Sequence, residues 1–201
     1  MSATQLASDE RAARSTGSPV LGMVLFVASE GMFFATFLAI YAMSYSSQAV
    51  WPPKDIPVPG LGLASAFTGV MVVSSLAMHL GLRAVRGGDA RGLSRWIGVT
   101  LALGAAFIAL QVVGLSQAGF GIDQGIFASL FYVLSAVALA HVAGGVAFLA
   151  MVLIRSTTGQ LGAEHHEPAE ALAIYWHFVV VMTVVMYVAF YLLVNVSPKG
   201  R

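Results

Sequence analysis

The apolar run from Val20 to Tyr45 contains the sequence VASEGMFF at positions 27–34, in which Glu30 is the only formally charged residue of the run. The run is long enough to cross a bilayer, which takes about 20 apolar residues in a helix. An ionised carboxylate at that depth costs several kcal/mol unless it is paired, protonated or turned toward protein. The sequence therefore predicts that this helix packs against a partner that accommodates Glu30.

The composition indicates a small membrane protein. Hydrophobic residues make up 58% of the 201 residues and charged residues only 9%, whereas a soluble domain carries about 25% charged residues. The formal net charge of +1 gives no indication of a nucleic-acid partner. Because the chain has no cysteine, disulfides, thiolate metal sites and haem attached through thioethers are excluded.

Five apolar segments are each near or above the length that spans a bilayer. They cover roughly residues 19–46, 61–85, 93–117, 126–155 and 171–196. Four prolines between positions 51 and 60 exclude a helix there and predict an extended loop at the membrane surface. We therefore expect an all-α fold, a polytopic bundle of five transmembrane helices over residues 19–196, with a polar tail at 1–18 and a short tail at 197–201.

The distribution of basic residues predicts the orientation of the bundle. With five spans, the N-terminus and the second and fourth loops share one side of the membrane. That side holds most of the basic residues, namely Arg11, Arg14, Arg83, Arg86, Arg91, Arg95 and Arg155. The positive-inside rule then places the N-terminus in the cytoplasm and the C-terminus outside. Because the first apolar run is too long for a signal peptide and contains Glu30, residues 1–18 are interpreted as a cytoplasmic tail rather than as part of a cleaved signal peptide.

Small residues recur at four-residue spacing in the predicted helices. The three sets are Ser65/Gly69, Gly98/Ala102/Ala106 and Ala136/Ala140/Gly144. Lipid offers no hydrophobic drive for helix association, so close backbone approach through small side chains takes that role. We expect these positions to lie at helix–helix contacts within the bundle.

The ionisable residues inside the predicted spans are Glu30, His79, His141 and His177. Glu30 and His141 lie nearest the middle of the bilayer and could pair if the first and fourth spans are neighbours, which would lower the cost of burying both. The alternative is that a hydroxyl, a carbonyl or water satisfies each one separately. A proton path through Glu30 is a further alternative, and the polar groups available to it on this helix are Ser29, Thr36 and Tyr41.

The histidines do not indicate a metal or haem site. Haem-binding bundles usually carry histidine pairs a turn or more apart on one helix, whereas each span here has a single histidine. The pair His165-His166 lies in a loop flanked by acids and is interpreted as a solvated or packing motif. We expect no metal, no haem and no catalytic residue in this chain.

Four motifs together resemble subunit III of the haem-copper terminal oxidases, the cytochrome c oxidase subunit 3 family. In order along the chain they are LFVASEGMFF at 25–34, WPP at 51–53, AHVAGG at 140–145, and the histidines at 165–166 followed by YWHFV at 175–179. Their order and spacing match that family over roughly residues 20–196. Five spans are similar to the short bacterial form of the subunit.

The resemblance implies a supporting role in a proton-pumping aerobic oxidase that reduces oxygen to water. Such a subunit binds no haem or copper itself, and packs directly on catalytic subunit I, which does, in a complex that also contains subunit II. It holds structural phospholipids, supports proton uptake and protects the oxidase from inactivation during turnover. The location implied is the bacterial plasma (inner) membrane. Lipid-binding residues implied by the resemblance are His79, Arg83, Trp176, His177 and Phe178.

Two departures from the family pattern bear on proton transfer. The family often has an acid after the YWHFV motif, where this chain has Val180, and a glutamate where this chain has Gly114. An obligatory proton wire through this subunit is therefore less expected than the structural and lipid-holding roles. Two other functions remain open from the sequence: an accessory subunit of a nitric-oxide reductase, and a freestanding small transporter or proton channel.

Overall fold

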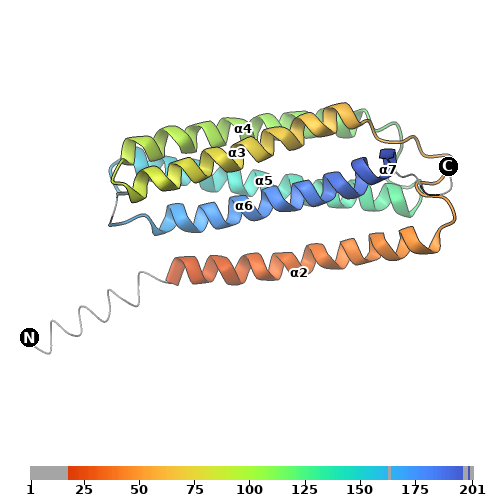
Figure 1. The fold of residues 1–201 in the computed structure, drawn as a ribbon, viewed down its shortest axis with the longest axis horizontal. Helices are drawn as coiled ribbons and strands as arrows, with labels where there is room; N and C mark the ends of the chain where they lie inside the picture. Colours follow the sequence, from red (N-terminus) through yellow and green to blue (C-terminus); the bar gives the residue numbers. More distant parts are fainter. Residues whose placement is uncertain (1–17, 163, 197–198, 200–201) are drawn as a thin grey trace, which may run out of the picture.

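The computed structural model of the chain describes residues 18–162, 164–196 and 199, and these form an antiparallel bundle of long helices (Figure 1). The long helices are α2 (Ser18–Ser47), α3 (Leu61–Arg86), α4 (Ala90–Ser116), α5 (Ile126–Thr157) and α6 (Glu167–Tyr187). The last one continues through a π-helical turn η1 (Val188–Leu192) into α7 (Leu193–Val196). Among the described residues, five helices are long and apolar enough to cross a membrane, which confirms the predicted all-α fold with five spans.

The helix boundaries differ from the predicted ones by a few residues, most at two N-termini. Helix α4 begins at Ala90, three residues early, because the carboxylate of Asp89 accepts a hydrogen bond from the main-chain N–H of Gly92 at 2.8 Å and caps the helix. Helix α6 begins at Glu167, four residues early, with Pro168 in its first turn. Proline has no N–H to lose at that position, and the acidic residues Glu167 and Glu170 suit the positive end of the helix dipole.

Helices α3, α4, α5 and α6 form the body of the bundle, and α2 lies alongside it (Figure 1). Within the body, α4 packs on both α3 and α5, and α6 packs on α3 and α5. Helix α2 packs on α6 and, less extensively, on α5. We call the end with the loops after α2 and α4 the Trp51 end, and the end with the loops after α3 and α5 the Arg86 end.

The closest helix contacts lie around Trp176 of α6, which is fully buried. A Cβ atom added to Gly104 of α4 would lie 2.7 Å from the Trp176 ring, and one added to Gly145 of α5 would lie 2.8 Å from it. The indole N–H donates to the hydroxyl of Ser74 on α3 at 3.0 Å. One side chain of α6 therefore contacts all three other helices of the body, two of them through glycine.

The predicted contacts at the sets of small residues are confirmed at Ser65, whose hydroxyl lies 2.7 Å from that of Tyr187 on α6, and are wrong at most of the other positions. Gly69 and Gly98 have no atom within 4 Å of an added Cβ, and Gly144 would meet only the Tyr175 hydroxyl, at 3.6 Å. The alanines of these sets, Ala102, Ala106, Ala136 and Ala140, are exposed on the helix surfaces. Four-residue spacing identifies a helix face but not the neighbour that it meets, and here Gly104 and Gly145 occupy the inward face.

The Trp51 end is closed by contacts between segments far apart in the sequence. The indole of Trp51 is 1% exposed and donates to the hydroxyl of Tyr41 at 3.1 Å. That hydroxyl in turn donates to the carbonyl oxygen of Ala189 within the π-helical turn. The ammonium group of Lys199 donates to the carbonyls of Tyr45 and Ser46 at 2.7 and 2.9 Å, at the negative C-terminal end of α2.

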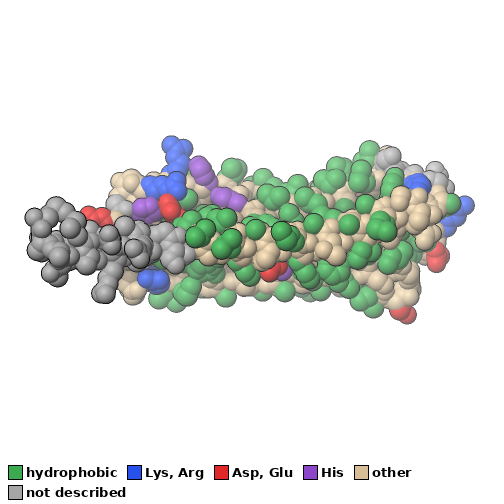
Figure 2. All heavy atoms as spheres, turned by 90° about the horizontal axis from the view of Figure 1, so that it is seen from below, with side chains coloured by type: hydrophobic (Ala, Val, Ile, Leu, Met, Phe, Trp, Pro, Cys, Tyr) green, Lys and Arg blue, Asp and Glu red, His purple; other side chains and the backbone are tan. Residues whose placement is uncertain are grey.

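The surface has an apolar middle and charged ends, as a membrane protein requires. Figure 2 shows hydrophobic side chains covering the long middle of the molecule, with basic and histidine side chains gathered toward the Arg86 end. At that end the guanidinium of Arg86 pairs with Glu170 at 2.8 Å, and Glu170 also meets His166 at 3.3 Å. These contacts join the end of α3 to the start of α6.

Candidate functional site

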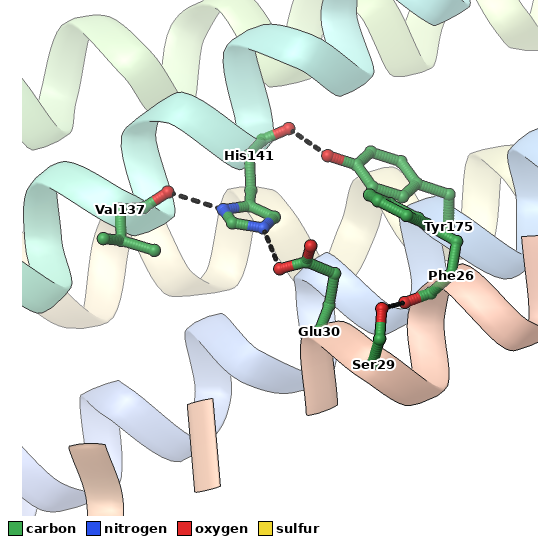
Figure 3. A network of polar contacts seen from close by, with 6 residues as sticks. All are labelled: Phe26, Ser29, Glu30, Val137, His141 and Tyr175. Carbon is green, nitrogen blue, oxygen red and sulfur yellow. Dashed lines mark hydrogen bonds and ion pairs between the residues drawn. The ribbon is translucent and has the colours of Figure 1, made fainter. Parts of the chain in front are cut away.

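The structure brings Glu30 of α2 and His141 of α5 into contact, with carboxyl Oε2 and imidazole Nε2 3.0 Å apart (Figure 3). At a rise of about 1.5 Å per residue, Glu30 lies about 18 Å along α2 and His141 about 23 Å along α5, near the middle of each helix. Their side chains are only 22% and 17% exposed. Pairing limits the cost of holding an ionisable group at that depth.

The hydrogen bonds of His141 fix how many protons the pair holds. Its Nδ1 lies 2.8 Å from the carbonyl oxygen of Val137, one turn earlier on α5. A carbonyl oxygen can only accept, so Nδ1 carries a hydrogen and donates it. The Nε2–Oε2 contact then needs one further proton, which sits either on the imidazole or on the carboxyl group. The pair therefore holds one exchangeable proton, in either of two arrangements.

Aromatic side chains surround the pair and complete its setting. The Tyr175 hydroxyl donates to the main-chain carbonyl of His141 at 2.9 Å (Figure 3). Phe34 of α2 is 2% exposed, and its ring meets the imidazole of His141 edge-on at a centroid distance of 5.2 Å. The same ring lies 6.0 Å from that of Phe178 on α6. The site is thus shared by α2, α5 and α6, and its walls are apolar.

The hydroxyl groups suggested by the sequence as a proton path do not contact Glu30. Ser29 donates to the carbonyl of Phe26 at 2.7 Å, and Thr36 to that of Met32 at 3.0 Å. Tyr41 donates to the carbonyl of Ala189. Each hydroxyl is used by a main-chain carbonyl, so along α2 these groups do not form a series through which a proton reaches the pair.

The five residues suggested for lipid binding fall into three places. His79 and Arg83 are one turn apart on α3 and both exposed, and the half-buried His177 joins them because its Nδ1 lies 2.7 Å from the hydroxyl of Ser75 on the same helix. Phe178 faces α2 instead, beside Phe34. Trp176 faces the core. The three consecutive residues of α6 diverge because each step along a helix turns by about 100°.

Two kinds of feature of this region had no signal in the sequence. The acceptors for His141 and Tyr175 are main-chain carbonyls, and every helical residue has one. The slot for Trp176 depends on Gly104 and Gly145, which are far apart in the chain and meet only through packing. Over the described part of the chain, no group of three or more His, Cys, Asp or Glu residues is placed to hold a metal ion.

Comparison with known proteins identifies the family. The family model described as "Cytochrome c oxidase subunit III" matches residues 5–195. Cytochrome c oxidase subunit 3 of Synechocystis sp. is 35% identical over 175 residues, covering 87% of this chain and 75% of that protein. The platypus (Ornithorhynchus anatinus) subunit 3 is 33% identical over 178 residues, covering 85% and 67%, and the probable subunit 3 of Nocardia farcinica is 31% identical over 175 residues, covering 85% and 86%. With five apolar helices and these relatives, the chain belongs to the cytochrome c oxidase subunit III family, and is thus a multi-pass membrane subunit of the aerobic terminal oxidase.

Proposed function

We propose that this chain is a non-catalytic subunit of a proton-pumping cytochrome c oxidase, one that stabilises catalytic subunit I and supports proton uptake and sustained turnover. The observation that carries the proposal is the Glu30–His141 pair. Nδ1 of His141 donates to the carbonyl of Val137, and the residues around the pair are mainly apolar. The hydroxyls of Ser29 and Thr36 on α2 donate to main-chain carbonyls and not to the pair. A carboxyl group held in this way fixes α2 to α5 and binds one exchangeable proton together with His141. It is not part of a continuous chain of proton-transferring groups along α2.

The proposal includes a bound phospholipid at the Arg86 end. His79 and His177 offer hydrogen-bond donors, and Arg83 adds positive charge, to a phosphate on one face of α3 and α6. Phe178 lies at the neighbouring α2–α6 contact, where it meets acyl chains or helix α2. Trp176 has no exposed surface, so in this proposal it contacts no lipid and instead holds α6 in the body of the bundle.

The orientation follows the charge distribution. Arg83, Arg86, Arg91, Arg95 and Arg155 lie at or near the Arg86 end, which we place in the cytoplasm of a bacterium, with the Trp51 end outside its plasma membrane. The haem and copper of the complex belong to partner subunits I and II in this proposal. A visible absorption spectrum of the purified complex tests this assignment: haem a bands with copper support it, whereas b-type haem with non-haem iron assigns the subunit to a nitric-oxide reductase.

The Glu30→Gln variant tests the supporting role directly. The glutamine amide can donate to Nε2 of a neutral His141, so the contact between α2 and α5 remains while the exchangeable proton is lost. We expect unchanged incorporation of the subunit and an unchanged initial rate of oxygen reduction, with several-fold fewer turnovers before inactivation. Ser29→Ala, whose hydroxyl bonds only within its own helix, is the matched control. Immediate loss of oxygen reduction in Glu30→Gln would show that Glu30 acts in the reaction itself.

A further inference from the structure

A second group of polar side chains lies inside the body, apart from the Glu30–His141 pair. Gln111 of α4, Ser135 of α5 and Thr183 of α6 are 5%, 2% and 5% exposed. All three line one cavity of about 20 Å³, which we call the core cavity. The rest of its lining is mainly aromatic and includes Phe67 and Tyr191. Polar groups from three helices thus converge on one small space in the core.

Gln111 is the member of this group whose hydrogen bonding is incomplete. Its side-chain oxygen Oε1 is buried and has no hydrogen-bond partner among the described residues. Thr183 donates its hydroxyl hydrogen to the carbonyl of Val179 at 2.9 Å, which leaves the lone pairs of its oxygen available to accept. Ser135 adds a hydroxyl that can both donate and accept. These three residues therefore present two acceptors and one hydroxyl of either kind to the cavity, whose lining also includes Tyr187 and Tyr191.

The size of the core cavity matches one water molecule. One water molecule needs a cavity of at least about 10–15 Å³ and two to four polar partners, whereas apolar cavities stay dry. We propose that the core cavity binds a single internal water, which donates to Oε1 of Gln111 and to Oγ1 of Thr183 and accepts from the hydroxyl of Ser135. The water links α4, α5 and α6 through hydrogen bonds that these side chains do not make with one another.

A neighbouring cavity gives this water an access route toward the Trp51 end. A larger cavity of about 130 Å³, lined by residues of the Trp51 end such as Gly60 and Gln117, shares Phe67 and Tyr191 with the core cavity. In this proposal, motion of these two rings connects the two spaces. Toward His141, Ala138 borders both the core cavity and a second space beside the imidazole. That second space is too small for a water molecule. In this proposal the water exchanges through the Trp51 end, and the Glu30–His141 pair lies apart from the water site.

Two measurements on the native oxidase complex test the water site. The first is a cryo-electron microscopy map at a resolution that shows ordered waters. We expect one peak within hydrogen-bond distance of both Gln111 Oε1 and Thr183 Oγ1. The absence of a peak there, in a map that shows waters elsewhere in the subunit, overturns the proposal.

The second measurement is a double-mutant cycle between Gln111 and Thr183. For each variant, the quantity measured is the midpoint temperature at which heating releases this subunit from the complex. We expect Thr183→Val to lower the midpoint by about 2–4 °C in the native background, and by less in the Gln111→Leu background, because the water is already lost there. Thr100→Val is the matched control, since Thr100 is also buried and donates to a carbonyl one turn earlier. Its effect should be the same in both backgrounds.

The cycle also separates the water from a direct side-chain contact. If Gln111 bonds directly to Ser135, then Gln111→Leu and Ser135→Ala are coupled while Gln111→Leu and Thr183→Val are additive. That outcome overturns the proposal, as does additivity in both cycles. Coupling of Gln111 to both partners, together with the peak in the map, supports it.

Discussion

Helices α2 and α6 are both apolar enough to cross a membrane, yet they are attached to the bundle in different ways. In its most apolar 18-residue stretch, α2 has 6% of its residues buried, against 44% for the span that begins with α6. Helix α6 is held by shape, because Trp176 enters the spaces left by Gly104 and Gly145. Helix α2 has little buried surface and is held by a few specific contacts, led by the Glu30–His141 pair.

The difference shows what holds helices together in lipid. Because lipid is as apolar as the side chains, burying apolar surface gives little drive for association, and close packing or polar bonds must supply it. The body of the bundle uses close packing. A peripheral helix with one face toward the body gains more from a polar contact, since its alternative partner is hydrocarbon.

The largest expected effect in this comparison comes from removing the Trp176 ring, through which α6 packs against α4 and α5. We expect Trp176→Ala to destabilise the subunit by about 3–5 kcal/mol, as large-to-small substitutions of buried aromatic residues do. The subunit should then be lost from the purified complex, measured as its ratio to the catalytic subunits. Trp96→Ala is the control, because Trp96 is 37% exposed on α4, and its ratio should be nearly unchanged. Equal losses would contradict packing around Trp176 as the main attachment of α6.

An intermediate effect is expected when the pair that holds α2 is broken on one side. Glu30→Leu leaves Nε2 of His141 without its partner, which costs about 1–3 kcal/mol, and the subunit should be retained less well during purification. The double variant Glu30→Leu/His141→Leu removes both polar groups and should recover part of that loss. If the double variant is retained less well than either single variant, each residue stabilises the subunit through contacts other than the Glu30–His141 hydrogen bond.

The smallest effect is expected at the second attachment of α2. Tyr41→Phe removes the hydroxyl that accepts from Trp51 and donates to the carbonyl of Ala189, and we expect a cost at the lower end of about 1–3 kcal/mol because both groups that lose a partner are uncharged. The midpoint temperature for release of the subunit should fall by a few degrees, with the initial rate unchanged. Tyr45→Phe, whose ring is 36% exposed, should leave the midpoint where it is. An effect of Tyr45→Phe as large as that of Tyr41→Phe would show that the buried hydroxyl contributes nothing specific.

The sequence predicted the spans well because their signal is local. Each is a run of apolar residues long enough for the bilayer, and the observed helices differ from the predicted ones by at most four residues at any end. The contact between Glu30 and His141 was also open to prediction. Ionisable groups are so costly at mid-membrane that few arrangements are available to them.

The sequence did not predict which small residues make close contacts. Gly144 and Gly145 are adjacent, yet only Gly145 lies against Trp176. The choice depends on how α5 is rotated about its axis, and neighbouring helices set that rotation. The same holds for Trp51, a residue type that prefers the membrane interface but is buried here beneath Tyr41 and Phe127.

Residue type alone sets the number of apolar helices, their lengths and the need to satisfy a carboxyl group in the middle of the membrane, because hydropathy and burial cost are local properties. Packing between helices sets the rest. It sets which glycines receive Trp176, which carbonyl fixes the proton on His141, and which side chains converge on the core cavity. Each of these depends on the rotation and depth of one helix relative to another, and no pattern within a single helix contains that information.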